Sequence, residues 1–278
     1  MAVFAGQGDP RRTMALLSRD TGTASGRPGR GPKPGLSVDL IVDTAIEIAD
    51  AEGLAALSMR AVGGRLGRTA MALYTYVPSK GELVDLMYDK AFAELAGDYS
   101  PGHGWRRAIT DWAEDLWRFL LRHPWVLQVS QARPVLGPHE YLVLEHAMRL
   151  LSASGLRGPR LRQATSALFS LVRGAAQTVA DTRHAFAATW VSEDDWWNAR
   201  SAMLHEVAPD FAERFPTLSR LAEEGTYDLA DESAPYLERA ARESLEFGLR
   251  ALLDGIETAT RGSAGRPPTG TEVSGPGR

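Results

Sequence analysis

Aromatic, hydroxyl and basic side chains gather between Ser58 and Lys80, in the stretch SMRAVGGRLGRTAMALYTYVPSK. Small side chains and threonine can lie against thymine methyl groups, while tyrosine and arginine can reach phosphate oxygens. Lys80 adjoins the expected start of a helix, where free backbone N–H groups attract an anion. These residue types predict contacts to double-stranded DNA. The expected DNA-contacting residues are Arg60, Thr69, Ala70, Met71, Ala72, Tyr74, Thr75, Tyr76 and Lys80.

Two short helices joined by a tight turn must position these side chains. The first is expected to begin at Ser58 and end at Gly67, and the second to run from Thr69 to about Tyr76. At this spacing the second helix lies across the first and can enter the major groove. The alternative is a generic three-helix packing unit. The apolar contacts expected to lock the crossing come from Val62, Leu66, Met71 and Leu73.

Composition narrows the class of protein. The 278 residues include no cysteine, which excludes disulfides and thiolate zinc sites and fits a reducing cytoplasm. No apolar run approaches the roughly 18 residues of a membrane span, and no apolar segment follows Arg11 and Arg12 to make a secretory signal. We find no catalytic triad order, glycine-rich strand–helix turn or metal-ligand spacing. The sequence therefore predicts neither an enzyme nor a cofactor or metal site.

Charge is distributed unevenly along the chain. The net charge is −4, yet residues 1–80 hold 10 Lys and Arg against 7 Asp and Glu, so that this part is net positive. A mildly basic end joined to an acidic body is typical of a chain that presents one end to phosphates.

The apolar spacing is helical wherever it is periodic, and no segment reads as a strand. We therefore expect an all-α protein with a disordered basic arm over 1–35, a helix-turn-helix domain over 36–82, a ligand-binding and dimerisation domain over 83–260, and a disordered tail over 261–278. The expected helices of the body are Trp105–Leu121, Pro124–Val129, Glu140–Ser154, Arg160–Arg183, Glu193–Val207, Ala212–Leu221 and Pro235–Ala259.

The arm carries Arg27, Arg30 and Lys33 on the extended segment GRPGRGPKP. Such a segment is similar to an AT-hook and predicts minor-groove contacts beside a major-groove helix. The alternative is a solvated tail whose positive charge has no role.

From Ser37 to Leu86 the chain resembles the DNA-binding domain of the tetracycline-repressor family, most of all in ALYTYVPSKGELVDLM. The resemblance implies that Tyr74, Tyr76 and Lys80 contact phosphates and that Arg60 and Ala70–Ala72 face bases. It extends, less specifically, to Ala259 through Trp105, Arg122–His123, Arg133–Pro134 and Tyr141–Glu145.

The resemblance also implies a homodimer built on a four-helix bundle between subunits. Two apolar stripes at helical spacing agree with it, and Gly174 and Gly248 would allow close approach. The alternative is that both stripes face the core of a single chain. The expected dimer residues are Leu161, Leu168, Val172, Ala175, Leu245, Leu249 and Leu252.

A small-molecule pocket is implied in the body. Trp105, Trp112 and Leu116 share one side of their expected helix, and aromatic planes suit a flat, largely apolar ligand. Core packing is the alternative for each tryptophan. The expected ligand-binding residues are Trp105, Trp112, Leu116, Arg133, Pro134, Phe169 and Gln177.

Departures from the tetracycline-binding members bear on the ligand. Ala96, Trp112, Leu116 and Val129 stand near positions where those members carry His, Asn, Phe and a metal-binding His. A tetracycline–magnesium chelate is therefore not expected. The sequence predicts a ligand-responsive repressor that binds a palindromic operator as a dimer; the alternative is an activator or a ligand-independent regulator of the same fold.

Overall fold

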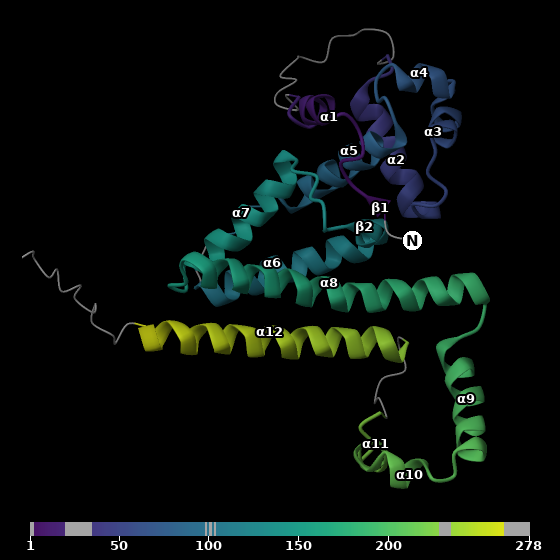
Figure 1. Ribbon diagram of the computed structural model, residues 1–278, viewed down its shortest axis with the longest axis vertical. Coiled ribbons are helices and arrows are strands. Elements are labelled where there is room, and N and C mark those ends of the chain that lie inside the picture. Colours follow the sequence, from purple (N-terminus) through teal and green to yellow (C-terminus); the bar gives the residue numbers. More distant parts are fainter. Residues whose placement is uncertain are drawn as a thin grey trace, which may run out of the picture.

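The structure is a computed structural model that describes residues 3–19, 35–97, 99, 102, 104–227 and 235–263. Within these residues nearly all regular structure is helical, which confirms the expected all-α class (Figure 1). The α-helices of more than four residues are α1 (Pro10–Leu17), α2 (Val38–Glu52), α3 (Met59–Leu66), α4 (Ala70–Tyr74), α5 (Lys80–Phe92), α6 (Trp105–Arg122), α7 (Pro138–Ser152), α8 (Gly158–Thr189), α9 (Glu193–Val207), α11 (Pro216–Glu223) and α12 (Tyr236–Ser263). The short ones are β1 (Val3–Phe4), η1 (Ala93–Leu95), η3 (Pro124–Gln128), β2 (Val129–Ser130) and α10 (Phe211–Arg214).

Hydroxyl side chains start the helices of the N-terminal domain. Ser37, Ser58, Thr69 and Ser79 each accept a hydrogen bond from the backbone N–H three residues ahead, at the starts of α2 to α5. Each bond satisfies a donor that the first helical turn leaves unpaired. These caps agree with the helix starts expected from the sequence.

The expectation of a disordered arm over 1–35 is wrong for residues 3–19. Val3 and Phe4 pair in parallel with Val129 and Ser130 as β1 and β2, and helix α1 follows on the surface of α5. Ala5 is fully buried. The Gly- and Arg-rich average composition of 1–35 conceals these short apolar segments, and the order comes from contacts with distant elements. Residues 20–34, with Arg27, Arg30 and Lys33, lie outside the described residues.

Helices α8 and α12 lie side by side and form one edge of the body (Figure 1). Gly248 makes their contact close, because a methyl group added there would lie 2.7 Å from the side chain of Leu171. Gly248 therefore serves packing within this chain rather than between chains. Gly174 is exposed and has open space before it.

Helices α9 to α11 project beyond the end of α8 (Figure 1). The single helix expected over Ala212–Leu221 is two short helices, since Pro216 starts a new one. Neither of these has a buried residue, and Trp190, Trp196 and Trp197 are exposed nearby. No helix among the described residues combines the length and apolar character that crossing a membrane requires.

Candidate functional site

The backbones of α3 and of the turn before α4 lie in close contact, and this contact positions the two helices of the helix-turn-helix. Gly63 on α3 is buried, and a methyl group added there would lie 2.7 Å from the carbonyl oxygen of Arg68. The N–H of Arg68 in turn donates to the carbonyl of Gly63 at 2.8 Å. Gly67 adopts the left-handed conformation (φ 63°) between them, which glycine tolerates without strain. Leu73 and Val62 are fully buried behind the crossing.

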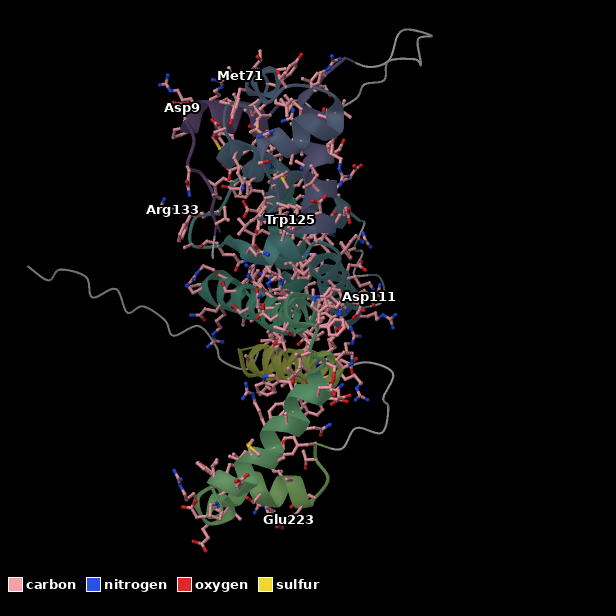
Figure 2. All side chains as sticks on the ribbon, turned by 90° about the vertical axis from the view of Figure 1, so that its right-hand side faces the viewer. Asp9, Met71, Asp111, Trp125, Arg133 and Glu223 are labelled. Atoms are coloured by element: carbon pink, nitrogen blue, oxygen red, sulfur yellow. The ribbon has the colours of Figure 1, made fainter. Side chains whose placement is uncertain are left out.

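Most residues expected to contact DNA are open to solvent. Tyr74 and Tyr76 are 40% and 38% exposed, while Ala70 and Ala72 are half-buried. Met71 is 74% exposed, so the expectation that it locks the helix crossing is wrong; Leu73 does this instead. Met71 lies at one extreme end of the molecule (Figure 2). The other exposed residues of the set are Arg60, Thr69, Thr75 and Lys80.

Basic side chains of this domain divide into paired and unpaired groups. Arg65 pairs with Glu52 at 2.8 Å, and Lys90 pairs with Asp43 at 2.6 Å. Arg60, Arg68 and Lys80 are exposed and have no ion pair with another described residue. Unpaired cations beside a capped helix start are suited to bind phosphate. Arg68 was missed by the sequence reasoning, although it directly precedes the cap Thr69.

A cavity of about 510 Å³ lies in the body between α5, α6, α7, α8 and the loop after β2. Its walls are mainly apolar, as in most small-molecule sites. The volume suits a ligand of several fused rings. The apolar and aromatic lining residues are Tyr88, Phe92, Leu116, Leu120, Pro134, Leu136, Tyr141, Val143, Leu144, Met148 and Phe169, and the polar ones are Gln131, Glu140, Arg162, Thr165, Ser166, Ser170 and Arg173.

Three of the residues expected at the ligand site line this cavity: Leu116, Pro134 and Phe169. Trp112 lies behind the wall, fully buried, with its ring edge-to-face against Phe169 at 5.2 Å.

The other three expected residues make contacts elsewhere. Arg133 lies over the ring of Phe4, with 5.8 Å between the guanidinium carbon and the ring centre. Gln177 donates to Asp181 at 2.8 Å, and Trp105 packs half-buried at the start of α6 beside Arg106. Each of these side chains is therefore occupied outside the cavity.

Ionisable side chains lie on the polar side of the cavity, and burial shifts the pKa of Tyr88 and of Glu140. Burial raises the pKa of the Tyr88 phenol, and the nearby Glu140 raises it further, so that Tyr88 is a neutral donor. Burial also raises the pKa of Glu140, whose carboxylate accepts from the Leu136 N–H at 2.6 Å. Arg173 donates to the carbonyls of Leu127 and Val129.

Sequence reasoning missed the polar residues Tyr88, Glu140 and Arg173. They come from three helices that are far apart in the chain, and no local pattern brings them together.

Helix α5 connects the cavity to the helix-turn-helix. Lys80 stands at its first residue, and Tyr88 and Phe92 near its other end line the cavity. The expected boundary at residues 82 and 83 therefore falls inside one continuous helix. Over its 13 residues this helix spans about 20 Å.

Asp89 joins α5 to the first turn of α7. Its buried carboxylate accepts from the backbone N–H groups of His139 and Glu140 at 2.9 and 3.0 Å, and from the ring of His139 at 2.9 Å. Gly137 leaves room for it, because a Cβ there would overlap the carboxylate. These bonds tie the first turn of α7, at the cavity wall, directly to α5.

Four residues expected at a dimer interface are buried within the single chain: Leu168, Val172, Leu245 and Leu249. Leu161, Ala175 and Leu252 are half-buried against the same core. The apolar stripes thus hold α8 and α12 together and against α6. Exposed residues at helical spacing on one side of each helix are Ala167, Ser170, Gly174 and Thr178 on α8, and Ser244, Phe247, Ala251 and Gly255 on α12; we call these sides the outward faces, and Ser170 also borders the cavity. Phe247 is 69% exposed.

Among the described residues no group of three or more carboxylate and imidazole side chains could hold a metal ion.

Comparison with known proteins gives a consistent result. Residues 100–260 match the family model described as "Tetracyclin repressor-like, C-terminal domain". The HTH-type transcriptional repressor DrrR1 of Streptomyces coeruleorubidus is 40% identical over 255 residues, which cover 91% of this chain and 87% of that protein. An HTH-type transcriptional regulator of Saccharopolyspora erythraea is 32% identical over 173 residues, 59% of this chain and 73% of that protein.

Solved structures of ActR from Streptomyces coelicolor have the same fold. The apo form superposes with a TM-score of 0.62 at 28% identity and covers 84% of this chain and 100% of ActR. The complex of ActR with actinorhodin gives a TM-score of 0.64 at 27% identity and covers 82% of this chain and 99% of ActR.

Proposed function

The chain belongs to the tetracycline-repressor family of transcriptional regulators, and we propose that it is a repressor that a flat aromatic ligand releases from DNA. One observation carries the proposal: helix α5 has Lys80, which forms no ion pair with another described residue, at its first residue and pocket residues Tyr88 and Phe92 near its other end. Because one rigid element belongs to both sites, occupancy of one biases the other. Membership of this family supports a regulatory role.

The DNA contacts proposed for this chain are of two kinds, contacts to phosphates and contacts to base edges. Tyr74, Tyr76 and Lys80 are proposed to bind phosphates, which position the protein without reading sequence. Met71 and Thr75, which are exposed around α4, and the half-buried Ala70 and Ala72 are proposed to lie against base edges. Apolar and methyl-bearing side chains of this kind favour thymine methyl groups in the major groove.

Selection of bound duplexes from a random-sequence library tests this step, with full-length protein as bait. The enriched sequence is expected to be palindromic. Replacing Lys80 by alanine is expected to weaken binding to that sequence about tenfold or more, since a charge-assisted hydrogen bond contributes about 1.5–3 kcal/mol. The matched control is Lys90→Ala on the same helix, whose lysine pairs with Asp43. Equal losses in the two variants would contradict the proposed phosphate contact.

We propose that the dimer forms through the outward faces of α8 and α12. Small side chains line both faces at spacings of three and four, and Phe247 is a large apolar side chain without cover in the described chain. Two copies of this helix pair would form a four-helix bundle in which Phe247 is buried. The bundle would set the distance between the two recognition helices.

The pocket chemistry supports a flat, polycyclic ligand with oxygen substituents on one edge. Phe92, Leu116 and Phe169 offer apolar and aromatic walls, while Tyr88 and Arg173 offer donors. Actinorhodin, the ligand in the ActR complex, is therefore the first probe to use. Its entry is expected to push on α7, move α5 through Asp89 and change the spacing of the two α4 helices, which fit successive major grooves only near about 34–36 Å apart.

A substitution that fills the cavity is expected to abolish the response to ligand while leaving DNA binding intact. Ser166 lines the cavity but is exposed, so Ser166→Trp occupies the ligand space without disturbing the core. We expect this variant to bind the selected duplex like the wild type and to stay bound when actinorhodin is added. Fluorescence anisotropy of the labelled duplex measures both properties, with Ser166→Ala as the control. Release of the tryptophan variant at the wild-type concentration of actinorhodin would contradict the assigned pocket.

A further inference from the structure

The N-terminal helix α1 lies at the same end of the molecule as the recognition helix α4. Figure 2 places Asp9, which precedes α1, toward the same end of the molecule as Met71. We propose that α1 is a second DNA-contacting element, in which Arg11 and Arg12 bind backbone phosphates next to the one assigned to Lys80. This inference rests on the proposed DNA binding and extends its footprint.

The chain directly before α1 is in contact with the start of α5, where Lys80 stands. A methyl group added at Gly81 would lie 3.7 Å from Cβ of Gln7, and one added at Gly8 would lie 2.6 Å from the Glu82 carboxylate. Asp9 then caps α1 by accepting from the Arg12 N–H at 2.8 Å. Arg11 and Arg12 therefore follow within a few residues of the Lys80 site.

Anchors on both sides fix how α1 is oriented. The N–H of Gly6 donates to both carboxylate oxygens of Asp85 on α5, at 3.1 Å each. Thr13 and Leu17 are buried against the body of the domain. At the far end Arg19 pairs with Asp39 on α2 at 2.7 Å. The helix is held as part of the domain, so side chains on its open face have a defined direction.

Charge distinguishes the open face of α1 from its anchored face. Arg11 and Arg12 are exposed and form no ion pair with another described residue, in contrast to Arg19. The acidic residues that contact the described segment just before α1 are Glu82 and Asp85, which are both buried, and Asp9 itself caps the helix. Two guanidinium groups without carboxylate partners are suited to bind phosphate oxygens, with no preference for base sequence.

The test is the salt dependence of binding by the full-length double variant Arg11→Gln/Arg12→Gln. Each lost phosphate contact lowers the slope of log K against log salt by about 0.9, so we expect a slope smaller by about 1.8 per bound chain, or about 3.6 for two chains on one palindromic duplex. Affinity at physiological salt should fall about tenfold, equally on the selected duplex and on an unrelated duplex. The control is Arg214→Gln/Arg220→Gln, which makes the same charge change on α10 and α11 at the opposite end of the molecule.

The outcomes separate this inference from the proposed function. A double variant with the wild-type slope, alongside a Lys80→Ala variant that loses affinity, overturns the α1 contact and leaves DNA binding intact. An equal loss in the Arg214/Arg220 control also overturns it, because the effect is then one of net charge. If the wild type binds no duplex, both the inference and the proposed function are overturned. Unchanged thermal unfolding of the variant shows that a loss of affinity does not come from a loss of the overall fold.

Discussion

Replacing Phe247 by glutamate is expected to convert the proposed dimer into a monomer of 30.2 kDa that no longer holds a palindromic operator. Phe247 is 69% exposed in the single chain, at the middle of the outward face of α12. A two-fold interface contains both copies of each substitution, so that two carboxylates would be buried in an apolar contact. Light scattering coupled to size-exclusion chromatography measures the mass.

The affinity for DNA should fall when the Phe247→Glu variant loses the dimer. Two linked recognition helices bind two half-sites with a high effective concentration, and a monomer loses this gain of about a hundredfold or more. The control is Phe247→Leu, which keeps an apolar side chain at the position and should remain dimeric. A glutamate variant that keeps the wild-type mass would contradict the assignment of this face to the interface.

Replacing Gly63 by alanine is expected to open the helix-turn-helix, whereas the same change at Gly64 should not. A methyl group at Gly63 would lie 2.7 Å from a backbone oxygen, that of Arg68, and backbone cannot move aside as a flexible side chain can. Overpacking of this kind costs about 1–3 kcal/mol, and the displaced α4 would lose its fit to the groove. Denaturant unfolding and anisotropy on the selected duplex measure the two effects.

Gly64 is the matched control because it neighbours Gly63 in the same helix and has nothing within 4 Å of an added methyl group. Alanine favours helix over glycine by about 1 kcal/mol, so Gly64→Ala should keep or raise stability. If both variants bind DNA like the wild type, the close contact between α3 and the turn is not what positions α4.

The helix-turn-helix could be predicted because its determinants are local. Ser58, Thr69 and Ser79 cap helices through bonds three residues away, and Gly67 ends α3 in a conformation that glycine favours. Met71 was misassigned as a core contact because α4 is only five residues long, which is too short for periodicity to separate its faces.

The pocket and the dimer face could be predicted only in part, since both depend on how distant helices pack. Phe169 and Leu116 were expected, but the periodicity of α6 could not separate residues that line a cavity from residues such as Trp112 that support its wall. Likewise the apolar stripe of α12 predicts that one face of the helix is buried, but it does not indicate whether the same chain or a second copy covers that face. The structure assigns Leu245 to the core of the chain and leaves Phe247 outside.

The order of residues 3–19 had no strong local signal. Val3 and Phe4 form a strand only because β2 lies beside them, 126 residues further along the chain. Average composition therefore misled the prediction for this segment.

The most direct test of the central claim is the stoichiometry and salt dependence of binding to the selected duplex, measured in one anisotropy titration series. We predict that two chains bind each palindromic duplex, that affinity falls steeply as salt rises, and that a single half-site binds far more weakly. Binding of one chain per duplex with no dependence on salt, or no binding at all, would contradict a dimeric DNA-binding regulator.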